Sequence, residues 1–228
     1  MRLYDGLKSF WNAVMPVTCE FCGEILVKGE RTLCLNCVSK LPYAELPNEN
    51  LIKRVNIYGR VEHIAVWLKF DKGNITQNLI HKFKYYDKIR IGRYLAELWC
   101  ANLQTIGWMN EIDVVIPLPL HRFRKIQRGF NQSEILAVAI GKAFNKPVVS
   151  DAVKRTRYTK SQASQAKNRW TNTDNAFAVC KPETLKGKRI LIVDDVITTG
   201  ASVANCIRAL YSAQPLSVSI ATLASSAY

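Results

Sequence analysis

The sequence predicts an α/β protein with a parallel sheet, preceded by a small metal-binding module. Short apolar runs alternate with segments whose apolar residues recur at helical spacing, which is typical of a parallel sheet covered by helices. One run, 189–193, ends in two carboxylates and a turn rich in hydroxyl groups and glycine. Near the N-terminus, two Cys-x-x-Cys pairs are separated by eleven residues.

Length and composition are those of a folded chain with one sizeable core and room for a small appendage. The chain has 228 residues, and 48% of them are hydrophobic. It contains no run of eighteen apolar residues and no basic-apolar leader pattern, so we expect neither a membrane span nor export, and a cytoplasmic location. An N-terminal segment, 3–14, has one apolar helical face that we expect to dock on the chain's own domain. That face comprises Leu3, Leu7, Phe10, Trp11 and Val14.

The chain is strongly basic, with a formal charge of +14 from 32 Lys and Arg against 18 Asp and Glu. The cations concentrate in three segments, 69–93, 122–128 and 154–169. Such an excess predicts polyanionic partners. Composition does not distinguish a phosphorylated small molecule from a nucleic acid backbone.

Four of the seven cysteines have the spacing of two thiolate knuckles around one tetrahedral ion. They are Cys19, Cys22, Cys34 and Cys37. We expect Zn²⁺ in a structural site, because protein ligands fill all four positions. Two disulfides or redox Cys-x-x-Cys motifs are the alternatives, and both conflict with an intracellular chain that has no signal peptide. The other cysteines, Cys100, Cys180 and Cys206, are assigned no chemistry.

The domain boundary is expected near residue 48, because prolines and a polar Asn-Glu-Asn stretch interrupt any periodic pattern there. Residues 1–47 would form the helix and tetracysteine module, and residues 48–228 the larger domain. Within the larger domain, 48–110 is expected to be a variable substrate cover and 111–228 the sheet core. Strands are predicted at 56–59, 64–70, 113–120, around 148, around 190 and at 216–223. Helices are predicted at 75–84, 90–103, 133–144 and from about 202.

The end of the run 189–193 predicts a sugar-phosphate site. Asp194 and Asp195 follow the apolar run, and the turn from Thr198 to Ser202 opens a helix. Backbone N–H groups of such a turn can receive a phosphate, while the two acids face sugar hydroxyls. No Lys lies between Asp194 and Arg208 and no GxGxxG occurs, which excludes Walker-type and dinucleotide-binding loops. The alternative is an ordinary strand whose acid pair caps a turn.

A second polar loop, 117–132, follows the predicted strand 113–120. It is shaped by Pro and Gly and carries five Arg, Lys or His side chains between residues 121 and 128. These side chains could bind a second phosphoryl group that faces the first site. A solvated basic loop is the alternative. Two phosphate-type loops after two parallel strands favour the binding site.

These motifs resemble a known family. Residues 194–202 resemble the phosphoribosyl-pyrophosphate (PRPP) motif of type I phosphoribosyltransferases, and 117–132 and the tetracysteine module resemble the ComF family within that superfamily. Residues 79–85 are a weaker match. Further matches are Arg155, Thr159, Gln162, Arg169, Asn172, Ala176 and Phe177. The resemblance covers nearly the whole chain and implies a parallel-sheet type I phosphoribosyltransferase fold with an N-terminal zinc ribbon.

The resemblance also implies roles for individual residues. Asp194 and Asp195 would bind the ribose hydroxyls. The 5′-phosphate would lie on Thr198, Thr199, Gly200, Ala201 and Ser202. The pyrophosphate, with Mg²⁺, would meet Leu120, His121, Arg122, Arg124, Arg128 and Gly129. A loop containing Arg155, Thr159, Gln162 and Arg169 would close over the reacting centre, with Arg169 acting beside the acid pair. The sequence departs from the family pattern in two places: at Ala201-Ser202, where Gly-Thr is frequent, and at Gln165, where an apolar residue is usual.

Two functions follow as hypotheses. The first is Mg²⁺-dependent transfer of phosphoribosyl from PRPP to an unidentified acceptor. The second, implied by the ComF resemblance, is handling of single-stranded DNA in natural competence, together with other competence proteins. It would use the zinc module, the basic surface and aromatic residues interleaved with Lys. Those aromatics are Trp67, Phe70, Phe83, Tyr85 and Tyr86. The sequence identifies neither the acceptor nor the oligomeric state.

Overall fold

The computed structural model describes residues 16–44, 49–85, 88–156 and 176–226. The predicted amphipathic segment 3–14 lies outside these ranges. No helix in the described ranges is long and apolar enough to cross a membrane.

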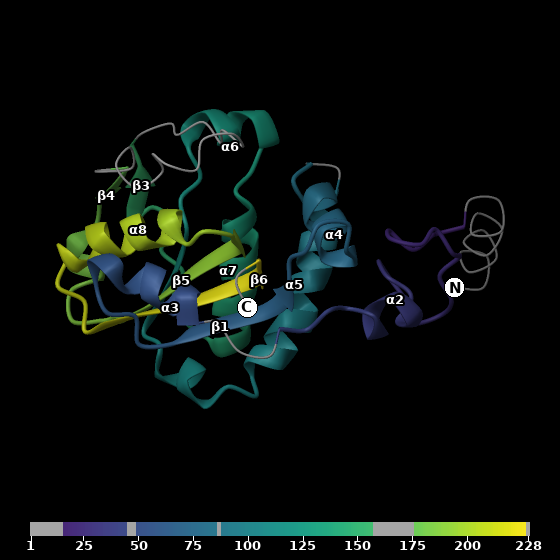
Figure 1. The fold of residues 1–228 in the computed structure, drawn as a ribbon, viewed down its shortest axis with the longest axis horizontal. Helices are drawn as coiled ribbons and strands as arrows, with labels where there is room; N and C mark the ends of the chain where they lie inside the picture. Colours follow the sequence, from purple (N-terminus) through teal and green to yellow (C-terminus); the bar gives the residue numbers. More distant parts are fainter. Residues whose placement is uncertain (1–15, 45–48, 86–87, 157–175, 227–228) are drawn as a thin grey trace, which may run out of the picture.

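A four-stranded parallel sheet forms the centre of the molecule (Figure 1). Its strands are β1 (Ile64–Lys69), β6 (Ser217–Ser225), β5 (Arg189–Ile197) and β2 (Val114–Pro117), hydrogen-bonded in the order β1-β6-β5-β2. Val148 extends the β2 edge through a single parallel bridge to Val115. A separate antiparallel pair consists of β3 (Val153–Arg155) and β4 (Phe177–Val179). The predicted parallel α/β sheet is therefore confirmed.

Helices cover both faces of the sheet. One face packs under α4 (Ile75–Phe83), α5 (Ile89–Leu103) and α7 (Gln132–Phe144), and the other under α3 (Glu49–Val55) and α8 (Ala201–Tyr211). Successive residues of β5 alternate between these two cores, with Leu191 and Val193 in the first and Ile190 and Ile192 in the second. This two-sided burial is the reason that the strand sequence is continuously apolar rather than alternating.

The N-terminal module, residues 16–44, lies on the side of α4 and α5 away from the sheet (Figure 1). It contains α2 (Leu35–Ser39) and a bridge between Thr18 and Ile25. The chain leaves the module along the edge of β1, where the Ala44 N–H donates to the Trp67 carbonyl at 2.9 Å. The module is therefore joined to the sheet through its edge strand.

Several elements differ from their predictions. Residues 56–58 form a 3₁₀ helix and not a strand. The predicted basic loop contains α6 (Arg122–Arg128), because the His121 side chain caps its start and Gly129, at φ +79°, ends it. Further short 3₁₀ helices are Gly107–Glu111 and Pro182–Thr184.

Two sheet boundaries also differ. β5 continues through the acid pair to Ile197, because β6 is long enough to pair with it as far as Ser225. β1 lies in the segment expected to be a substrate cover, yet it pairs with β6 from Ile64 to Lys69. That part of 48–110 belongs to the sheet.

Candidate active site and metal centre

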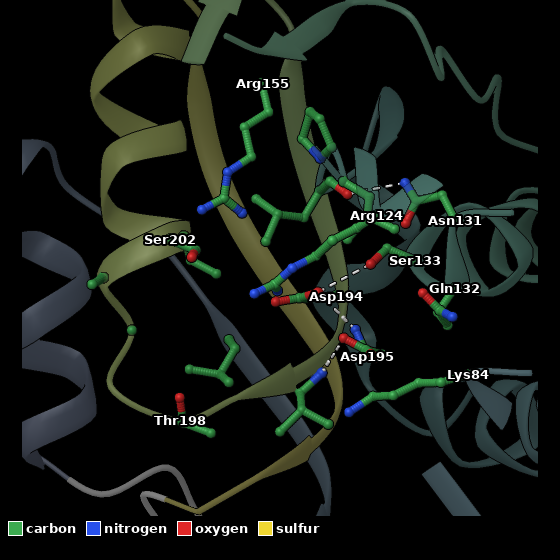
Figure 2. Close-up of a pocket in the computed structure, with 18 of the residues that line it drawn as sticks. Lys84, Arg124, Asn131, Gln132, Ser133, Arg155, Asp194, Asp195, Thr198 and Ser202 are labelled. Carbon is green, nitrogen blue, oxygen red and sulfur yellow. Dashed lines mark hydrogen bonds between the residues drawn. The ribbon is translucent and has the colours of Figure 1, made fainter. Parts of the chain in front are cut away.

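A cavity of about 370 Å³ opens at the carboxyl ends of β5 and β2 (Figure 2). Its walls come from the end of β5, the turn into α8, the segment from Leu118 to Ser133, and three side chains from elsewhere. Those three are Phe70, Lys84 and Arg155. The carboxyl edge of a parallel sheet is where such folds bind ligands, because loops from neighbouring strands meet there.

The acid pair lies in the cavity wall at the end of β5. Asp194 is 7% exposed, and its Oδ1 accepts hydrogen bonds from Ser133 Oγ at 3.0 Å and from the Asp195 N–H at 2.9 Å. Burial, with the neighbouring Asp195 charge as a second cause, raises the pKa of Asp194 well above its usual value. A cation or a set of hydroxyl donors entering the cavity would lower that pKa again.

The turn that follows β5 lines the cavity along its full length, from Thr198 to Ser202. Gly200 is in the left-handed region at φ +79° and forms the N-cap of α8. A Cβ at this position would lie 3.3 Å from Val55 Cγ1. The turn is thus packed against α3, and the first residues of α8 line the cavity, where the N–H groups of a helix N-terminus can bind an anion.

Four cations complete the cavity wall. Arg124 and Arg128 come from α6, Arg155 from the end of β3, and Lys84 from the end of α4. Burial lowers the pKa of Lys84, Arg128 and Arg155, and the charge of Arg124 acts in the same direction. In Figure 2, Lys84 extends toward Asp195 and Arg155 points into the cavity. Four cations against two carboxylates make the site suitable for a polyanion.

The residues predicted to meet pyrophosphate divide into two groups. Leu120, Arg124 and Arg128 line the cavity, whereas His121, Arg122 and Gly129 do not. His121 Nδ1 accepts the Phe123 N–H at 3.3 Å, and burial lowers the pKa of its imidazole. Arg122 is exposed at the first position of α6. His121 and Gly129 therefore form the two ends of α6, and Arg122 lies outside the cavity.

The loop predicted to close over the reaction falls largely outside the described residues. Thr159, Gln162 and Arg169 belong to the segment 157–175, as do Gln165 and Asn172. The two ends of this segment are held together, since the Thr156 N–H donates to the Ala176 carbonyl at 2.8 Å. Arg155, beside this junction, is in the cavity wall.

Lys84 and Gln132 are among the cavity residues that sequence reasoning missed. Gln132 is 2% exposed, its Oε1 accepts from Arg128 Nη1 at 3.0 Å, and its Nε2 has no hydrogen-bond partner within the described part of the chain. The Asn-Gln-Ser sequence at the start of α7 was a local signal for Gln132. For Lys84 the signal was the weaker family match at 79–85, but only the packing of α4 brings its side chain to Asp195.

The four predicted metal ligands do cluster. The Sγ atoms of Cys19, Cys22, Cys34 and Cys37 all lie within 4.8 Å of one another, and Cys22 and Cys34 are 3.7 Å apart. Tetrahedral zinc with bonds of about 2.3 Å requires sulfur atoms about 3.8 Å apart, so the arrangement fits a four-thiolate metal site.

The state of the cysteines also fits such a site. All seven cysteines are free, so the disulfide alternative is excluded in this structure. Burial raises the pKa of the Cys19 thiol, but hydrogen bonds from the backbone N–H groups of Cys22, Cys34 and Phe21 outweigh it and leave the pKa at about 6.

Comparison with known proteins defines the family to which this chain belongs. Residues 130–227 match the model of the phosphoribosyl transferase domain. The chain is 31% identical to Competence protein F of Haemophilus influenzae over 175 residues, covering 74% of each chain. It is 29% identical to DNA utilization protein YhgH of Escherichia coli over 205 residues, covering 85% of this chain and 86% of that protein. The chain belongs to the ComF family of phosphoribosyltransferase-like proteins.

Solved structures that match part of this chain include two enzymes. One is the glutamine PRPP amidotransferase from B. subtilis, with a TM-score of 0.43 and 18% identity over 62% of this chain and 30% of that one. The other is the purine phosphoribosyltransferase from Pyrococcus horikoshii, with a TM-score of 0.39 and 18% identity over 58% of this chain and 74% of that one.

Proposed function

We propose that the cavity binds PRPP together with Mg²⁺ and that the protein transfers its phosphoribosyl group to an acceptor. One observation carries the proposal: a phosphate-type turn, a pair of carboxylates and four cations surround a single cavity at the carboxyl edge of the sheet. The turn suits the 5′-phosphate, the acid pair suits the ribose hydroxyls, and Arg124, Arg128 and Lys84 suit the pyrophosphate. Family membership supports this assignment.

The chemistry of transfer is consistent with this division of charge. The bond from ribose C1 to a pyrophosphate oxygen breaks, and its electron pair leaves with the pyrophosphate. A lone pair of the acceptor forms the new bond to C1, and the acceptor releases a proton. Positive charge therefore grows on the ribose near Asp194 and Asp195, and negative charge grows near the cations. Bound Mg²⁺ would add further positive charge at the leaving group.

Calorimetric titration with PRPP and Mg²⁺ tests the proposal. We expect saturable binding by the wild type and its loss in the Asp194→Asn/Asp195→Asn double variant. Absence of binding by the wild type, or full binding by the double variant, would contradict the proposal.

Two single variants of α6 refine this test. Arg124→Met should weaken PRPP binding by roughly tenfold or more, since a hydrogen bond to a charged group is worth about 1.5–3 kcal/mol. Arg122→Met removes the same charge from the same helix, but outside the cavity, and should bind PRPP as the wild type does. Equal losses of PRPP affinity in the two variants would mean that the net charge of the protein, and not the position of Arg124 in the cavity, determines binding.

We also propose that the ion in the cysteine cluster is Zn²⁺ with a structural role. Four thiolates occupy every position of a tetrahedral ion, so no position remains for water or substrate. Elemental analysis of the purified protein should give one zinc per chain.

Single-stranded DNA is a second candidate ligand, at a different surface. Of the predicted aromatic residues, Trp67 and Phe83 are core residues, 3% and 0% exposed, whereas Tyr85 is 56% exposed. Phe70 lines the cavity, and Tyr86 lies outside the described ranges. The outer face of α6 instead presents Phe123, 66% exposed, between the exposed cations Arg122 and Lys125. An aromatic ring flanked by cations suits stacking on a base next to a phosphate backbone. The names of the competence and DNA utilization relatives are consistent with this candidate.

Fluorescence anisotropy with a labelled oligonucleotide tests this second candidate. Phe123→Ala should cost about 1–3 kcal/mol of binding free energy, and the affinity should fall steeply with salt. Lys186→Met, an exposed cation beside the amino end of β5, is the control and should have little effect. Affinity that is independent of salt would rule out this use of α6.

A further inference from the structure

We infer that Glu20 of the cysteine module is a positioning residue that holds Lys84 in the cavity, so that the module sets the affinity of the site for a pyrophosphate group. The inference rests on the proposed function and extends it to a residue about 60 positions away from Lys84. It joins the metal centre to the candidate active site.

Glu20 is a buried carboxylate at which three cations converge. It stands directly after Cys19, is 9% exposed, and its N–H donates to the Thr32 carbonyl at 2.9 Å. Its Oε1 accepts from Lys88 Nζ at 3.3 Å and from Arg90 Nη2. Lys82 Nζ lies 3.9 Å from Oε2 and also donates to the Glu20 carbonyl oxygen.

These three cations lie on both sides of Lys84 in the sequence. Lys82 is in the last turn of α4, and Lys88 and Arg90 are at the start of α5. Lys84 forms the C-cap of α4 between them, and its side chain lines the cavity near Asp195. The stretch of chain that carries Lys84 is therefore fixed to Glu20 on both sides.

Packing on the other side of α4 leaves little room for adjustment. Phe83, fully buried, lies so close to α5 that a Cβ on Gly92 would meet its ring at 2.0 Å. The ring of Phe83 also contacts that of Phe130, with 5.9 Å between centroids. Without the Glu20 carboxylate, the three cations would repel one another, and a shift of Lys82 at the end of α4 would carry Lys84 with it.

A second ion pair between the module and α5 provides a matched control. Arg31 Nη2 and Glu97 Oε2 are 2.6 Å apart, but their side chains are 66% and 54% exposed. Glu97 lies on α5 beyond the stretch that carries Lys84. Loss of this ion pair should have almost no effect on the stability of the protein, because exposed ion pairs contribute little to stability.

Binding of inorganic pyrophosphate with Mg²⁺, measured by calorimetry, tests the inference. We expect Lys84→Met to raise Kd roughly tenfold or more, and Glu20→Gln to raise it by about threefold to tenfold. The double variant should bind no more weakly than Lys84→Met alone, because Glu20 acts through Lys84. Glu97→Gln should bind as the wild type does, and metal analysis should show a full metal content in every variant.

The outcomes separate this inference from the proposed function. A wild type that binds no pyrophosphate overturns both. Wild-type affinity in Glu20→Gln, or a loss in the double variant equal to the sum of the single losses, overturns only the role of Glu20. Should Glu20→Gln fail to fold, Lys88→Met/Arg90→Met removes the same contacts from α5 and is compared with Lys84→Met in the same way.

Discussion

Asp194 illustrates the conflict between stability and binding at the level of one residue. Its carboxyl group is buried, has a charged carboxylate as its neighbour, and has a raised pKa. Between the ordinary pKa of an aspartate and this raised value, the folded protein binds a proton that the unfolded chain has released. Stability is therefore lost as the pH rises through that window, and the loss persists above it.

Asp194→Asn should stabilise the ligand-free protein at pH 7.5. We expect Tm to rise by roughly 2–4 °C for each kcal/mol of destabilisation that the substitution removes. The gain should vanish below about pH 3, where Asp194 is protonated in both the folded and the unfolded state. Differential scanning calorimetry between about pH 3 and pH 8 measures this.

Asp151→Asn is the matched control. Asp151 forms an exposed ion pair with Lys181 at 2.7 Å, so its replacement should leave Tm almost unchanged. A lower Tm for Asp194→Asn than for the wild type at pH 7.5 would show that burial does not penalise this carboxylate.

At the scale of elements, the phosphate-type turn depends on α3 as much as on its own sequence. Gly200 begins α8 in the left-handed conformation, and Leu51 and Val55 of α3 pack against it, so that a Cβ would lie 3.5 and 3.3 Å from their methyl carbons. Two requirements therefore meet at one position: positive φ and close approach of a helix. The second requirement is absent at Gly73, which has φ +84° but open space around it.

Comparison of Gly200→Ala with Gly73→Ala separates these two requirements. Both variants should lose about 1–2 kcal/mol from left-handed strain, as measured by urea unfolding. Gly200→Ala should lose more than Gly73→Ala and should also weaken PRPP binding, because its Cβ displaces the turn from α3. Equal losses and unchanged binding would mean that the contact with α3 has no influence on the turn.

At the scale of the whole molecule, a small module with little core of its own packs against a large α/β domain. The module joins the domain through the edge of β1, through the buried Glu20 contacts, and through the exposed Arg31–Glu97 pair. Four thiolates around Zn²⁺ would change the formal charge by 2 − 4 = −2, from +14 to +12. A bound metal would thus organise the module without removing the basic character of the molecule.

Removal of the metal with a chelator under reducing conditions should unfold the module locally. Hydrogen exchange should lose protection at residues 18–34 and at the start of α5, while β5 and β6 stay protected. Cys34→Ser should reproduce this result, whereas Cys180→Ser, at an exposed cysteine outside the cluster, should retain the metal. Loss of protection throughout the sheet would show that the two parts unfold as one unit.

Much of the architecture was predictable because its causes are local. The continuous apolar run of β5 indicated a strand covered on both faces, and the Cys-x-x-Cys spacing predicted that four thiolates would meet. The acid pair and the turn at Thr198–Ser202 are contiguous in the chain, so their common location needed no knowledge of packing. The sequence did not predict α6, because the helix is capped by the His121 side chain and nothing in the run of cations indicated such a cap.

The sequence by itself determined the parallel α/β class, the tetracysteine cluster and one half of the cavity, since each depends on the spacing of neighbouring residues. Tertiary structure alone decided the rest. Pairing with β6 extends β5 through the acid pair to Ile197. The start of α6 places Arg122 outside the cavity, and the packing of α4 places Lys84 near Asp195. Tertiary structure also joins Glu20 to Lys88, 68 residues away. Such contacts depend on how helices pack over a twisted sheet, which no local pattern specifies.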